Sequence, residues 1–326
     1  MNNFFKLIFA IALTVTISSC NKDDDTYVEP LRDYSEQYAK DLDSIDEYID
    51  THYMEVDADY NVTFTEIPEN GTQLSIRQQT TYPLDFAMVQ NEDHDVNYKV
   101  YFIKLREGTE RRPSEVDSVH VAYRGSLVSD VQFDYAASPL WFQLQDVVPG
   151  WSEIIPKFKT GTYDVAEGPN PVTYDNYGAG IMFLPSGLGY YANSSPSGTI
   201  AAYSPLIFSF KLMELRYKDH DRDGILSKDE RDPNDPTKKL IDYDSDGDGI
   251  ANMYDVDDDG DRVLTKNEIK YVYTVGSVEY TRYYPYDGAA TDDPITPWDE
   301  SKGIPNCSND FTTPTRLRKH LDPSCH

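Results

Sequence analysis

Apolar residues recur at a helical spacing near the N-terminal end of the chain. From Asp33 onward they lie three or four positions apart, which is the period of an amphipathic helix. The members of this stripe are Tyr34, Tyr38, Leu42, Ile45, Ile49 and Tyr53. Because an apolar stripe must be covered, we expect the helix to pack on the domain that follows it or to serve as a dimerisation arm. The next segment, residues 57–81, is polar and has a turn signal at Asn70-Gly71.

Short segments of β type come next. They are Tyr98–Leu105, Ser118–Tyr123, Ile181–Leu184 and Pro205–Leu215. One short helix is indicated between them, beginning near Pro149 and stopped by Pro156, because proline cannot continue a helix interior. The pattern predicts an α+β fold in which an antiparallel β-sheet wraps a short helix.

The composition changes sharply after Leu215. Residues 219–268 contain 17 acidic and 7 basic side chains, a net charge of −10, so we expect a separate module there. Lys270 to His326 is rich in Tyr, Pro and Thr and shows no regular period.

The size and charge of the chain limit its class. With 326 residues, 39% of them hydrophobic and 13% aromatic, it is long enough for two or three domains with a real core. A formal net charge of −28 argues against nucleic acid as a partner, because phosphate binding depends on Lys and Arg. Such acidity favours solubility or bound cations.

An apolar run from Phe4 to Ser18 is followed directly by Ser19 and Cys20. The run is too short for a membrane-spanning helix. It resembles the lipobox of bacterial lipoproteins, whose signal is cleaved so that the cysteine carries the lipid; the alternative is a plain secretory signal with an incidental cysteine. Residues 21–25, NKDDD, resemble the acidic export signal of surface lipoproteins in Bacteroidetes-type bacteria. The resemblance implies a lipid-anchored protein of the bacterial cell envelope, in the outer membrane, facing the periplasm or the cell surface.

The other two cysteines, Cys307 and Cys325, lie near the C-terminus. A disulfide persists in an exported protein. We therefore expect a bridge that staples the tail, with two free thiols or a bridge to a partner as the alternatives.

The stretch from Val119 to Trp151 is the strongest candidate for a binding site. Its large apolar groups are Tyr123, Phe133, Leu140, Phe142 and Trp151, and its groups capable of covalent chemistry are chiefly the carboxylates of Asp130, Asp134 and Asp146. This composition suits a pocket that binds and desolvates a ligand rather than one that attacks it.

The chain from Tyr98 to Leu215 resembles the FKBP-type peptidyl-prolyl isomerases over about 120 residues. The matching motifs, in chain order, are VHVAYRG, VQFDYA, FQL, VVPGW, FKTG, FLPSGLGYY and LIFSFKLMEL. The resemblance implies an FKBP-like sheet and a proline pocket with Trp151 as its floor. The pocket residues that it implies are Tyr123, Phe133, Asp134, Leu140, Phe142, Val147, Val148, Trp151, Tyr190, Ile200 and Phe208.

The resemblance also implies a mechanism. The backbone N–H of Val148 would hold the carbonyl after the substrate proline, and the Tyr190 hydroxyl would hold a second carbonyl. Rotation about an X–Pro bond needs no nucleophile, because its barrier of about 18–20 kcal/mol comes from amide resonance. An apolar pocket favours the less polar twisted amide. The alternative is a peptide-binding or chaperone domain without significant isomerase activity.

Three features depart from the family pattern. Residues 162–180 form an insertion, which predicts a lid or a lengthened hairpin. Leu140 stands where many members carry an aromatic residue, and Ala201 and Ala202 stand where prolines are frequent. We expect these changes to affect peptide selectivity and drug affinity more than the fold.

Three acidic loops follow. Residues 219–230, DHDRDGILSKDE, match the EF-hand calcium loop, with glycine at position 6. Residues 244–255, DSDGDGIANMYD, repeat the pattern and end in the shorter Asp255. In residues 257–268, DDDGDRVLTKNE, Arg262 replaces the glycine of the sharp turn. Ca²⁺ takes about six to eight oxygen ligands, which explains the alternation of acidic residues; an acidic, solvated linker is the alternative.

The predicted calcium ligands are the carboxylates at positions 1, 3, 5 and 12 and the main-chain carbonyl at position 7, with Ser227 acting directly or through water. They are Asp219, Asp221, Asp223, Ile225 and Glu230 in the first loop; Asp244, Asp246, Asp248, Ile250 and Asp255 in the second; and Asp257, Asp259, Asp261, Val263 and Glu268 in the third. Pro233 interrupts any helix that leaves the first loop, so the module resembles the consecutive Asp-rich loops of thrombospondin type-3 repeats. We expect the calcium to be structural, not catalytic.

No phosphate-binding loop, GxGxxG, HExxH or GxSxG motif is found, and no organic cofactor is expected. We divide the chain into a signal peptide (1–19), a linker and amphipathic helical region (20–95), an isomerase domain (96–217), an EF-hand-like calcium-loop module (218–270) and a tail (271–326). The main hypothesis is an isomerase that acts on proline-containing polypeptides, and the alternative is a calcium-stabilised peptide-binding lipoprotein. The oligomeric state is left open.

Overall fold

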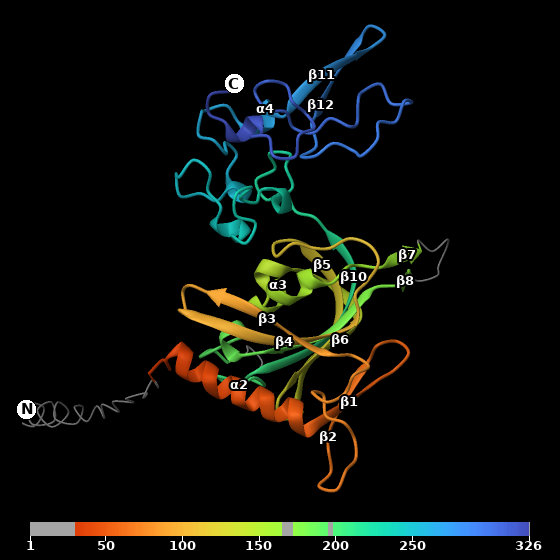
Figure 1. The fold of residues 1–326 in the computed structure, drawn as a ribbon, viewed down its shortest axis with the longest axis vertical. Coiled ribbons are helices and arrows are strands. Elements are labelled where there is room, and N and C mark those ends of the chain that lie inside the picture. Colours follow the sequence, from red (N-terminus) through yellow and green to blue (C-terminus); the bar gives the residue numbers. More distant parts are fainter. Residues whose placement is uncertain (1–29, 165–171, 195–197, 326) are drawn as a thin grey trace, which may run out of the picture. The chain divides into compact units, whose positions relative to one another are not determined.

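The computed structural model describes residues 30–164, 172–194 and 198–325. The predicted signal peptide and Cys20 lie outside the described residues. None of the helices in these ranges is both long and apolar enough to cross a membrane. Figure 1 shows the arrangement of the elements.

A six-stranded sheet is the centre of the fold, with the order β3-β4-β9-β10-β5-β6 and antiparallel pairing between all neighbours. Its strands are β3 (Leu84–Asn91), β4 (Val96–Arg106), β5 (Ser118–Leu127), β6 (Gln132–Gln143), β9 (Gly178–Leu184) and β10 (Leu206–Arg216). The antiparallel sheet predicted from the sequence is therefore present.

Both faces of this sheet are covered. In β4, Tyr98, Val100 and Phe102 belong to one hydrophobic cluster, whereas Tyr101, Ile103 and Leu105 belong to another. Side chains of a strand point alternately to the two faces, so each cluster lies on its own side of the sheet. Burial on both sides explains why β9, with the sequence GAGIMFL, is buried at every position.

A short helix covers the first face. It is α3 (Pro149–Ile154), continued by the 3-10 turn η2 (Ile155–Lys157), as the two prolines predict. Proline at the first position fits the start of a helix, because its missing N–H would have no intrahelical partner there. Trp151, Ile154 and Phe158 bury their side chains in the cluster on this face. Two further 3-10 turns are η1 (Leu144–Asp146) and η3 (Ser186–Leu188).

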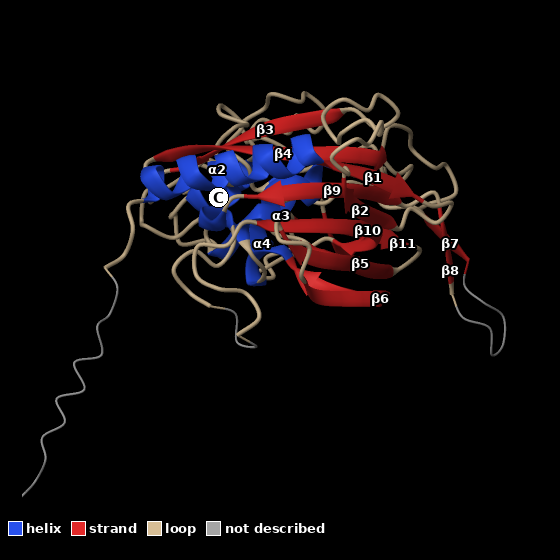
Figure 2. Cartoon of the chain, turned by 90° about the horizontal axis from the view of Figure 1, so that it is seen from below, coloured by secondary structure: helices blue, strands red, loops and turns tan. Residues whose placement is uncertain are grey.

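The long helix α2 (Tyr34–Thr51) covers the opposite face, as Figures 1 and 2 show. The carboxylate of Asp33 caps it by accepting hydrogen bonds from the N–H groups of Ser35 and Glu36. Ile45 and Ile49 are buried in the second cluster, and each contributes about 1.5–3 kcal/mol by burial. The apolar stripe is thus covered by its own chain, although Tyr53 lies beyond the helix, in β1.

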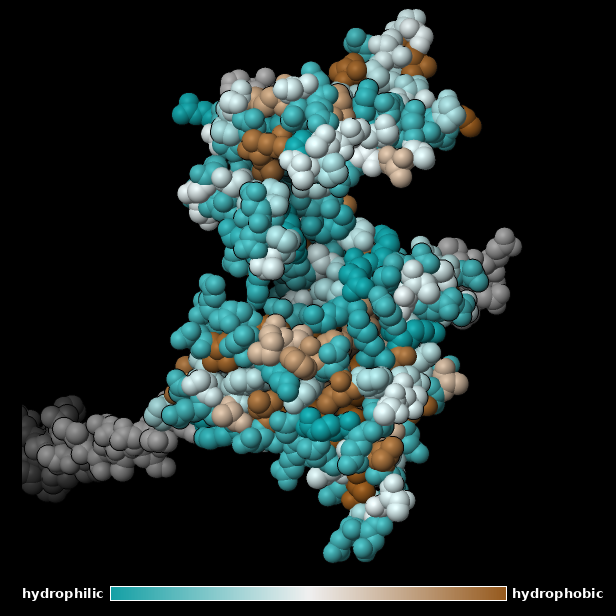
Figure 3. All heavy atoms as spheres, in the orientation of Figure 1, coloured by the Kyte–Doolittle hydropathy of each residue, from teal (hydrophilic) through white to brown (hydrophobic). Residues whose placement is uncertain are grey.

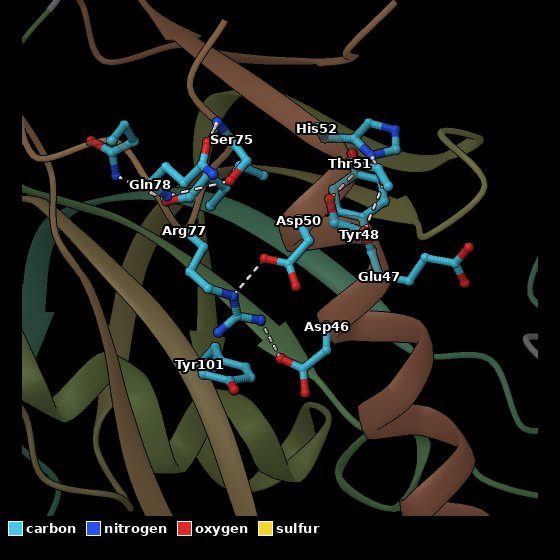
Figure 4. A network of polar contacts seen from close by, with 12 residues as sticks. Asp46, Glu47, Tyr48, Asp50, Thr51, His52, Ser75, Arg77, Gln78 and Tyr101 are labelled. Atoms are coloured by element: carbon cyan, nitrogen blue, oxygen red, sulfur yellow. Dashed lines mark hydrogen bonds and ion pairs between the residues drawn. The ribbon is translucent and has the colours of Figure 1, made fainter. Parts of the chain in front are cut away.

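The segment after α2 folds back against it. The strands β1 (His52–Val56) and β2 (Val62–Glu66) form a hairpin. Arg77 then donates a 2.6 Å hydrogen bond to Asp50 and another to Asp46, both on α2 (Figure 4). These ion pairs attach the segment around Arg77 to the helix. In the sequence this segment has the composition of a polar loop.

The described residues of the insertion, 162–164 and 172–180, contain a short antiparallel pair of strands. Its strands are β7 (Thr162–Asp164) and β8 (Thr173–Asp175). The Tyr174 hydroxyl lies 3.3 Å from the His120 ring, which stacks on Trp141. His120 pairs with Trp141 across β5 and β6, and their neighbours Val119 and Phe142 belong to the core side. Neighbouring residues of a strand point to opposite faces, so His120 and Trp141 lie on the other face. The described part of the hairpin therefore contacts that face of β5 and β6.

The C-terminal part contains few regular elements. They are the 3-10 turns η4 (Ser227–Asp229), η5 (Leu240–Asp242), η6 (Asn252–Tyr254) and η7 (Lys319–Leu321), the single-turn helix α4 (Thr265–Glu268), and the hairpin of β11 (Lys270–Val275) and β12 (Val278–Tyr283). A disulfide joins Cys307 to Cys325. Hydrophilic residues prevail on the molecular face drawn in Figure 3, and hydrophobic residues form small groups.

Candidate functional site

A cavity of about 400 Å³ opens on the α3 side of the sheet. Its wall combines β5, β6, the start of α3, the turn after η3, and β10. The lining residues are Tyr123, Phe133, Asp134, Phe142, Asp146, Val147, Val148, Pro149, Trp151, Gly189, Tyr190 and Phe208.

Trp151 is the centre of the aromatic wall. Its ring meets those of Tyr123, Phe142 and Phe208 edge to face, with centroid distances of 5.3, 5.5 and 5.3 Å. Edge-to-face packing is the favoured geometry of aromatic pairs, and it holds the rings in fixed orientations. The indole N–H of Trp151 is buried and has no hydrogen-bond partner within the described residues.

A glycine allows the wall to close. A Cβ atom at Gly125 would lie 2.5 Å from the Phe133 ring and 3.0 Å from Phe208. Residue 125 must therefore lack a side chain for Phe133 and Phe208 to meet, which they do with a centroid distance of 5.5 Å. This packing gives a structural reason for the glycine at the end of the VHVAYRG motif.

The cavity has few polar groups. The Tyr123 hydroxyl donates a 2.5 Å hydrogen bond to Asp134. Burial, and then this bond to the carboxylate, raises the pKa of Tyr123, so the hydroxyl stays protonated. Within the described residues, the Val148 N–H and the Tyr190 hydroxyl donate to no protein acceptor. These two groups can therefore hydrogen-bond to a ligand.

Helix α2 supports the part of the wall that carries Tyr190. Asp41, a buried residue of α2, accepts hydrogen bonds from the Ser186 N–H at 2.7 Å and the Ser186 hydroxyl at 2.5 Å. Ser186 begins η3, and the Tyr191 N–H in turn donates to the Ser186 carbonyl. The position of Tyr190 thus depends on a carboxylate that belongs to another segment of the chain.

Two of the predicted pocket residues do not line the cavity. Leu140 is 49% exposed and pairs with Val121 across β5 and β6. Ile200 is buried in the hydrophobic cluster beside Trp151. Asp130 lies elsewhere, where it accepts hydrogen bonds from Tyr48 and, at 3.2 Å, contacts the His52 ring.

The three acidic loops share one backbone geometry. Positions 4 and 6 have positive φ in each of them. The values are 66° and 108° at Arg222 and Gly224, 81° and 95° at Gly247 and Gly249, and 68° and 78° at Gly260 and Arg262. Arg262 therefore adopts the left-handed conformation that the other two loops assign to glycine, and the third loop makes the same turn.

Hydrogen bonds inside the loops also repeat. The N–H at position 7 donates to the aspartate at position 5 in every loop, with lengths of 2.7, 2.8 and 2.6 Å for Ile225, Ile250 and Val263. The side chains at position 9 accept from the N–H at position 2; they are Ser227, Asn252 and Thr265. Position 9 thus stabilises the loop itself.

The structure brings the predicted ligands at positions 1, 3 and 5 together in each loop. Within each group, one oxygen per residue lies within 4.8 Å of the others. Among the described residues, a fourth group combines Asp223 and Glu230 of the first loop with Asp258, a residue that the motif did not indicate. Asp255 and Glu268 belong to none of the four groups.

Among the three loops, the carboxylate whose pKa is raised most belongs to the first loop. Burial, and then repulsion by Asp258 and other carboxylates, raises the pKa of Glu230 to about 11. Burial and the charge of Asp223 raise the pKa of Asp258 to about 9. In the second loop, by contrast, the backbone N–H of Gly249 lowers the pKa of Asp244. Buried carboxylates without a cation are costly, so the first loop fits a bound cation best.

Two family models match the chain. The model described as FKBP-type peptidyl-prolyl cis-trans isomerase matches residues 109–213. This range contains the whole lining of the cavity. The model described as BamM C-terminal matches residues 220–298, which include the second and third acidic loops, the first loop except Asp219, and the hairpin of β11 and β12.

Curated relatives match the same region. The outer membrane protein MIP of Legionella longbeachae is 30% identical over 124 residues, which are 37% of this chain and 44% of the relative. A probable FKBP-type 25 kDa isomerase of Pseudomonas aeruginosa is 26% identical over 153 residues, 45% and 59% of the two chains. The FKBP-type isomerase FkpA of Buchnera aphidicola is 29% identical over 136 residues, which are 40% of this chain and 47% of the relative. The chain spans about half the length of these relatives.

Two solved structures are similar in part. An isomerase from Pseudomonas syringae pv. tomato is 25% identical and has a TM-score of 0.29, with coverage of 36% of this chain and 74% of that chain. FkpA from Escherichia coli is 18% identical and has a TM-score of 0.33, with coverage of 56% of this chain and 62% of that chain.

The family model and the curated relatives match the part of the chain that builds the cavity. Residues 109–213, which carry Trp151, are similar to the FKBP-type peptidyl-prolyl cis-trans isomerases.

Proposed function

We propose that the protein is a peptidyl-prolyl cis-trans isomerase that acts on X–Pro bonds of exported or envelope proteins. The observation that carries this proposal is the cavity around Trp151, in which aromatic walls leave the Val148 N–H and the Tyr190 hydroxyl available to a peptide.

The cavity suits rotation about an amide bond. The planar amide is polar and well solvated, whereas the twisted amide has lost its resonance and is less polar. A wall of aromatic rings excludes water and so disfavours the planar form relative to the twisted one. Hydrogen bonds from Val148 and Tyr190 would hold the carbonyls on both sides of the rotating bond and prevent the peptide from turning as a whole.

We further propose that Ca²⁺ binds the three acidic loops and stabilises the C-terminal module. The common backbone turn of the three loops supports this assignment, and so do the unpaired buried carboxylates of the first and third loops. Oxygen-only ligand groups favour a hard cation such as Ca²⁺ over a transition metal. Calcium would remove the repulsion between carboxylates and take no part in the rotation.

The proposed location is the bacterial envelope, with a lipid at Cys20 as the anchor. The apolar run that ends at this cysteine supports the proposal. One relative, MIP of Legionella longbeachae, is described as an outer membrane protein, which agrees with it.

An isomerisation assay on a short proline peptide tests the enzymatic proposal. We expect Phe142→Ala to lower kcat/KM by about tenfold, equal to about 1.4 kcal/mol of transition-state stabilisation, because the change opens the aromatic wall to water. Leu140→Ala is the matched control, since Leu140 lies two residues away on the same strand but outside the cavity; its rate should equal that of the wild type.

The outcome separates an isomerase from a binding domain. If the wild type binds the peptide but leaves its isomerisation at the uncatalysed rate, the enzymatic proposal is lost and the peptide-binding alternative stands.

A further inference from the structure

Three carboxylates from two different loops meet in the interior of the C-terminal module. Asp223 and Glu230 belong to the first loop, and Asp258 is the second residue of the third loop. One oxygen of each lies within 4.8 Å of the others. The side chains are almost inaccessible, with exposures of 2% for Asp223, 4% for Glu230 and 1% for Asp258.

Most oxygens of these carboxylates lack a hydrogen-bond partner. Both oxygens of Glu230, both oxygens of Asp258 and one oxygen of Asp223 are buried without a hydrogen bond. The nearest cationic candidate is His320, whose Nε2 lies 4.0 Å from Asp258. The His320 ring is itself buried, with an exposure of 2%. Among the described residues, no Lys or Arg forms an ion pair with any of the three carboxylates. A bound cation would supply the missing partner.

The carboxylate of Asp258 lies close to two carboxylates of the first loop. Its backbone N–H donates to the Thr265 hydroxyl, as the N–H at position 2 does in the other loops. There, however, the side chain at position 2 also bonds within its loop: His220 contacts Ser227, and Ser245 contacts Asn252. Both oxygens of the Asp258 carboxylate are buried without a hydrogen bond, and one of them lies within 4.8 Å of oxygens of Asp223 and Glu230.

Packing holds the first and third loops together around this cluster. Ile225 of the first loop, Ile269 directly after the third loop, and Ile304 of the tail form one hydrophobic cluster. In addition, the Lys266 ammonium donates to the Arg222 carbonyl at 3.4 Å. The meeting of Asp258 with the first loop is thus part of a packed interior rather than a chance approach of surface chains.

We propose that Asp258 is a ligand of the divalent cation in the first loop, which therefore joins the first and third loops through one metal site. This inference rests on the proposed calcium binding and adds a ligand that the loop motif does not contain. It also assigns the cation a role in tertiary structure: binding at the first loop would fix the third loop and, through Ile304 and His320, the tail.

Calorimetric titration of the full-length protein, stripped with a chelator and titrated with CaCl₂ alone, tests the proposal. Asp258→Asn keeps the size and removes one ligand charge, so we expect the affinity of the first-loop site to fall by about tenfold or more. Asp219→Asn, a change at a motif ligand of the same loop, should weaken the same binding step. Asp242→Asn is the charge-matched control, because Asp242 is exposed and outside every carboxylate group; its titration should match the wild type.

Thermal unfolding with chelator and with calcium provides a second measurement. Without metal, Asp258→Asn relieves repulsion, so the variant should melt at or above the wild-type temperature. With calcium, the same variant should melt below the wild type. A purely structural carboxylate would instead lower the melting temperature in both conditions, which would overturn the proposal; so would failure of both Asp258→Asn and Asp258→Ala to fold in chelator.

The titration also distinguishes this inference from the broader calcium assignment. If the wild type shows no calcium binding, both fail. If the wild type binds calcium and Asp219→Asn weakens that binding whereas Asp258→Asn leaves it unchanged, only the role of Asp258 is rejected.

Discussion

The hydroxyl of Tyr123 is the best-placed single group for a test of the cavity. It reaches Asp134 at 2.5 Å and lies on the aromatic wall. We expect Tyr123→Phe to lower kcat/KM by a few-fold, because the wall loses the bond that fixes the ring, while stability falls by about 0.5–1.5 kcal/mol. Tyr174→Phe is the control, since Tyr174 is a partly exposed tyrosine on the hairpin of β7 and β8. Equal rates for the two variants would contradict a role for Tyr123 in the site.

Arg262 permits a test of backbone strain in the third loop. A non-glycine residue in the left-handed region costs about 1–2 kcal/mol, and Arg262 has a φ of 78°. Because glycine avoids this cost but loses more chain entropy on folding, Arg262→Gly should stabilise the calcium-loaded protein by about 0.5–1 kcal/mol. Gly249→Ala, at the same position of the second loop, should change the stability in the opposite sense. Thermal unfolding in calcium measures both, and a destabilised Arg262→Gly would refute the strain argument.

Single residues differ in how well the sequence predicts them. Trp151 and Phe208 carry the family motif, and both line the cavity. Leu140 occupies a motif position as well, but it is exposed on the edge of the sheet. Asp258 could not be found from the motif, because position 2 is not a ligand position of the calcium loop and the partners of Asp258 lie about 30 residues away in the chain. Contacts of this kind depend on how the loops pack.

At the scale of elements, helix α2 is joined to the cavity through Asp41. Asn at this position keeps the size but loses the charge that accepts two hydrogen bonds from Ser186. A hydrogen bond to a charged group contributes about 1.5–3 kcal/mol, so Asp41→Asn should loosen η3. Because Tyr190 follows this turn, we expect a higher KM for the proline peptide and a smaller change in kcat.

Asp46→Asn is the control for that experiment. Asp46 lies on the same helix and pairs with Arg77, away from the cavity. If Asp41→Asn reduces stability but leaves KM at the wild-type value, Asp41 supports the fold and not the site.

The elements themselves were predictable to different degrees. Helix α2 and strands β4 and β10 follow from apolar periodicity, and their bounds lie close to the prediction. Strand β6 gives no such signal, because it is an edge strand with exposed positions, register shifts and a proline at position 139. An edge strand tolerates proline and polar side chains. Strand β3, the other edge, likewise carries exposed residues on half of its length.

At the scale of the whole molecule, the segment that leads into β5 connects the acidic module with the domain that contains the cavity. Arg231 donates from one nitrogen to both carboxylate oxygens of Glu115, each at 2.8 Å, and the Leu240 N–H donates to the same carboxylate. Val116 packs with Leu240 and Met253. No residue of the module lines the cavity, however. The module is therefore positioned to support the domain from outside the site.

This arrangement predicts how calcium removal affects the protein. Calcium that binds only the folded state stabilises it by about 2.7 kcal/mol when its concentration is 100 times Kd, and its loss restores the repulsion among buried carboxylates. Scanning calorimetry of the full chain should therefore show a transition of the module that moves to lower temperature in EGTA. The isomerisation rate at a temperature below that transition should stay within about twofold, because the wall of the cavity comes entirely from residues 123–208. Magnesium at the same concentration is the control, since Mg²⁺ is smaller, demands a near-ideal octahedral geometry and dehydrates reluctantly. A rate that collapses in EGTA while the isomerase domain remains folded would show that calcium acts on the site itself, and the module would then have to be regarded as regulatory rather than structural.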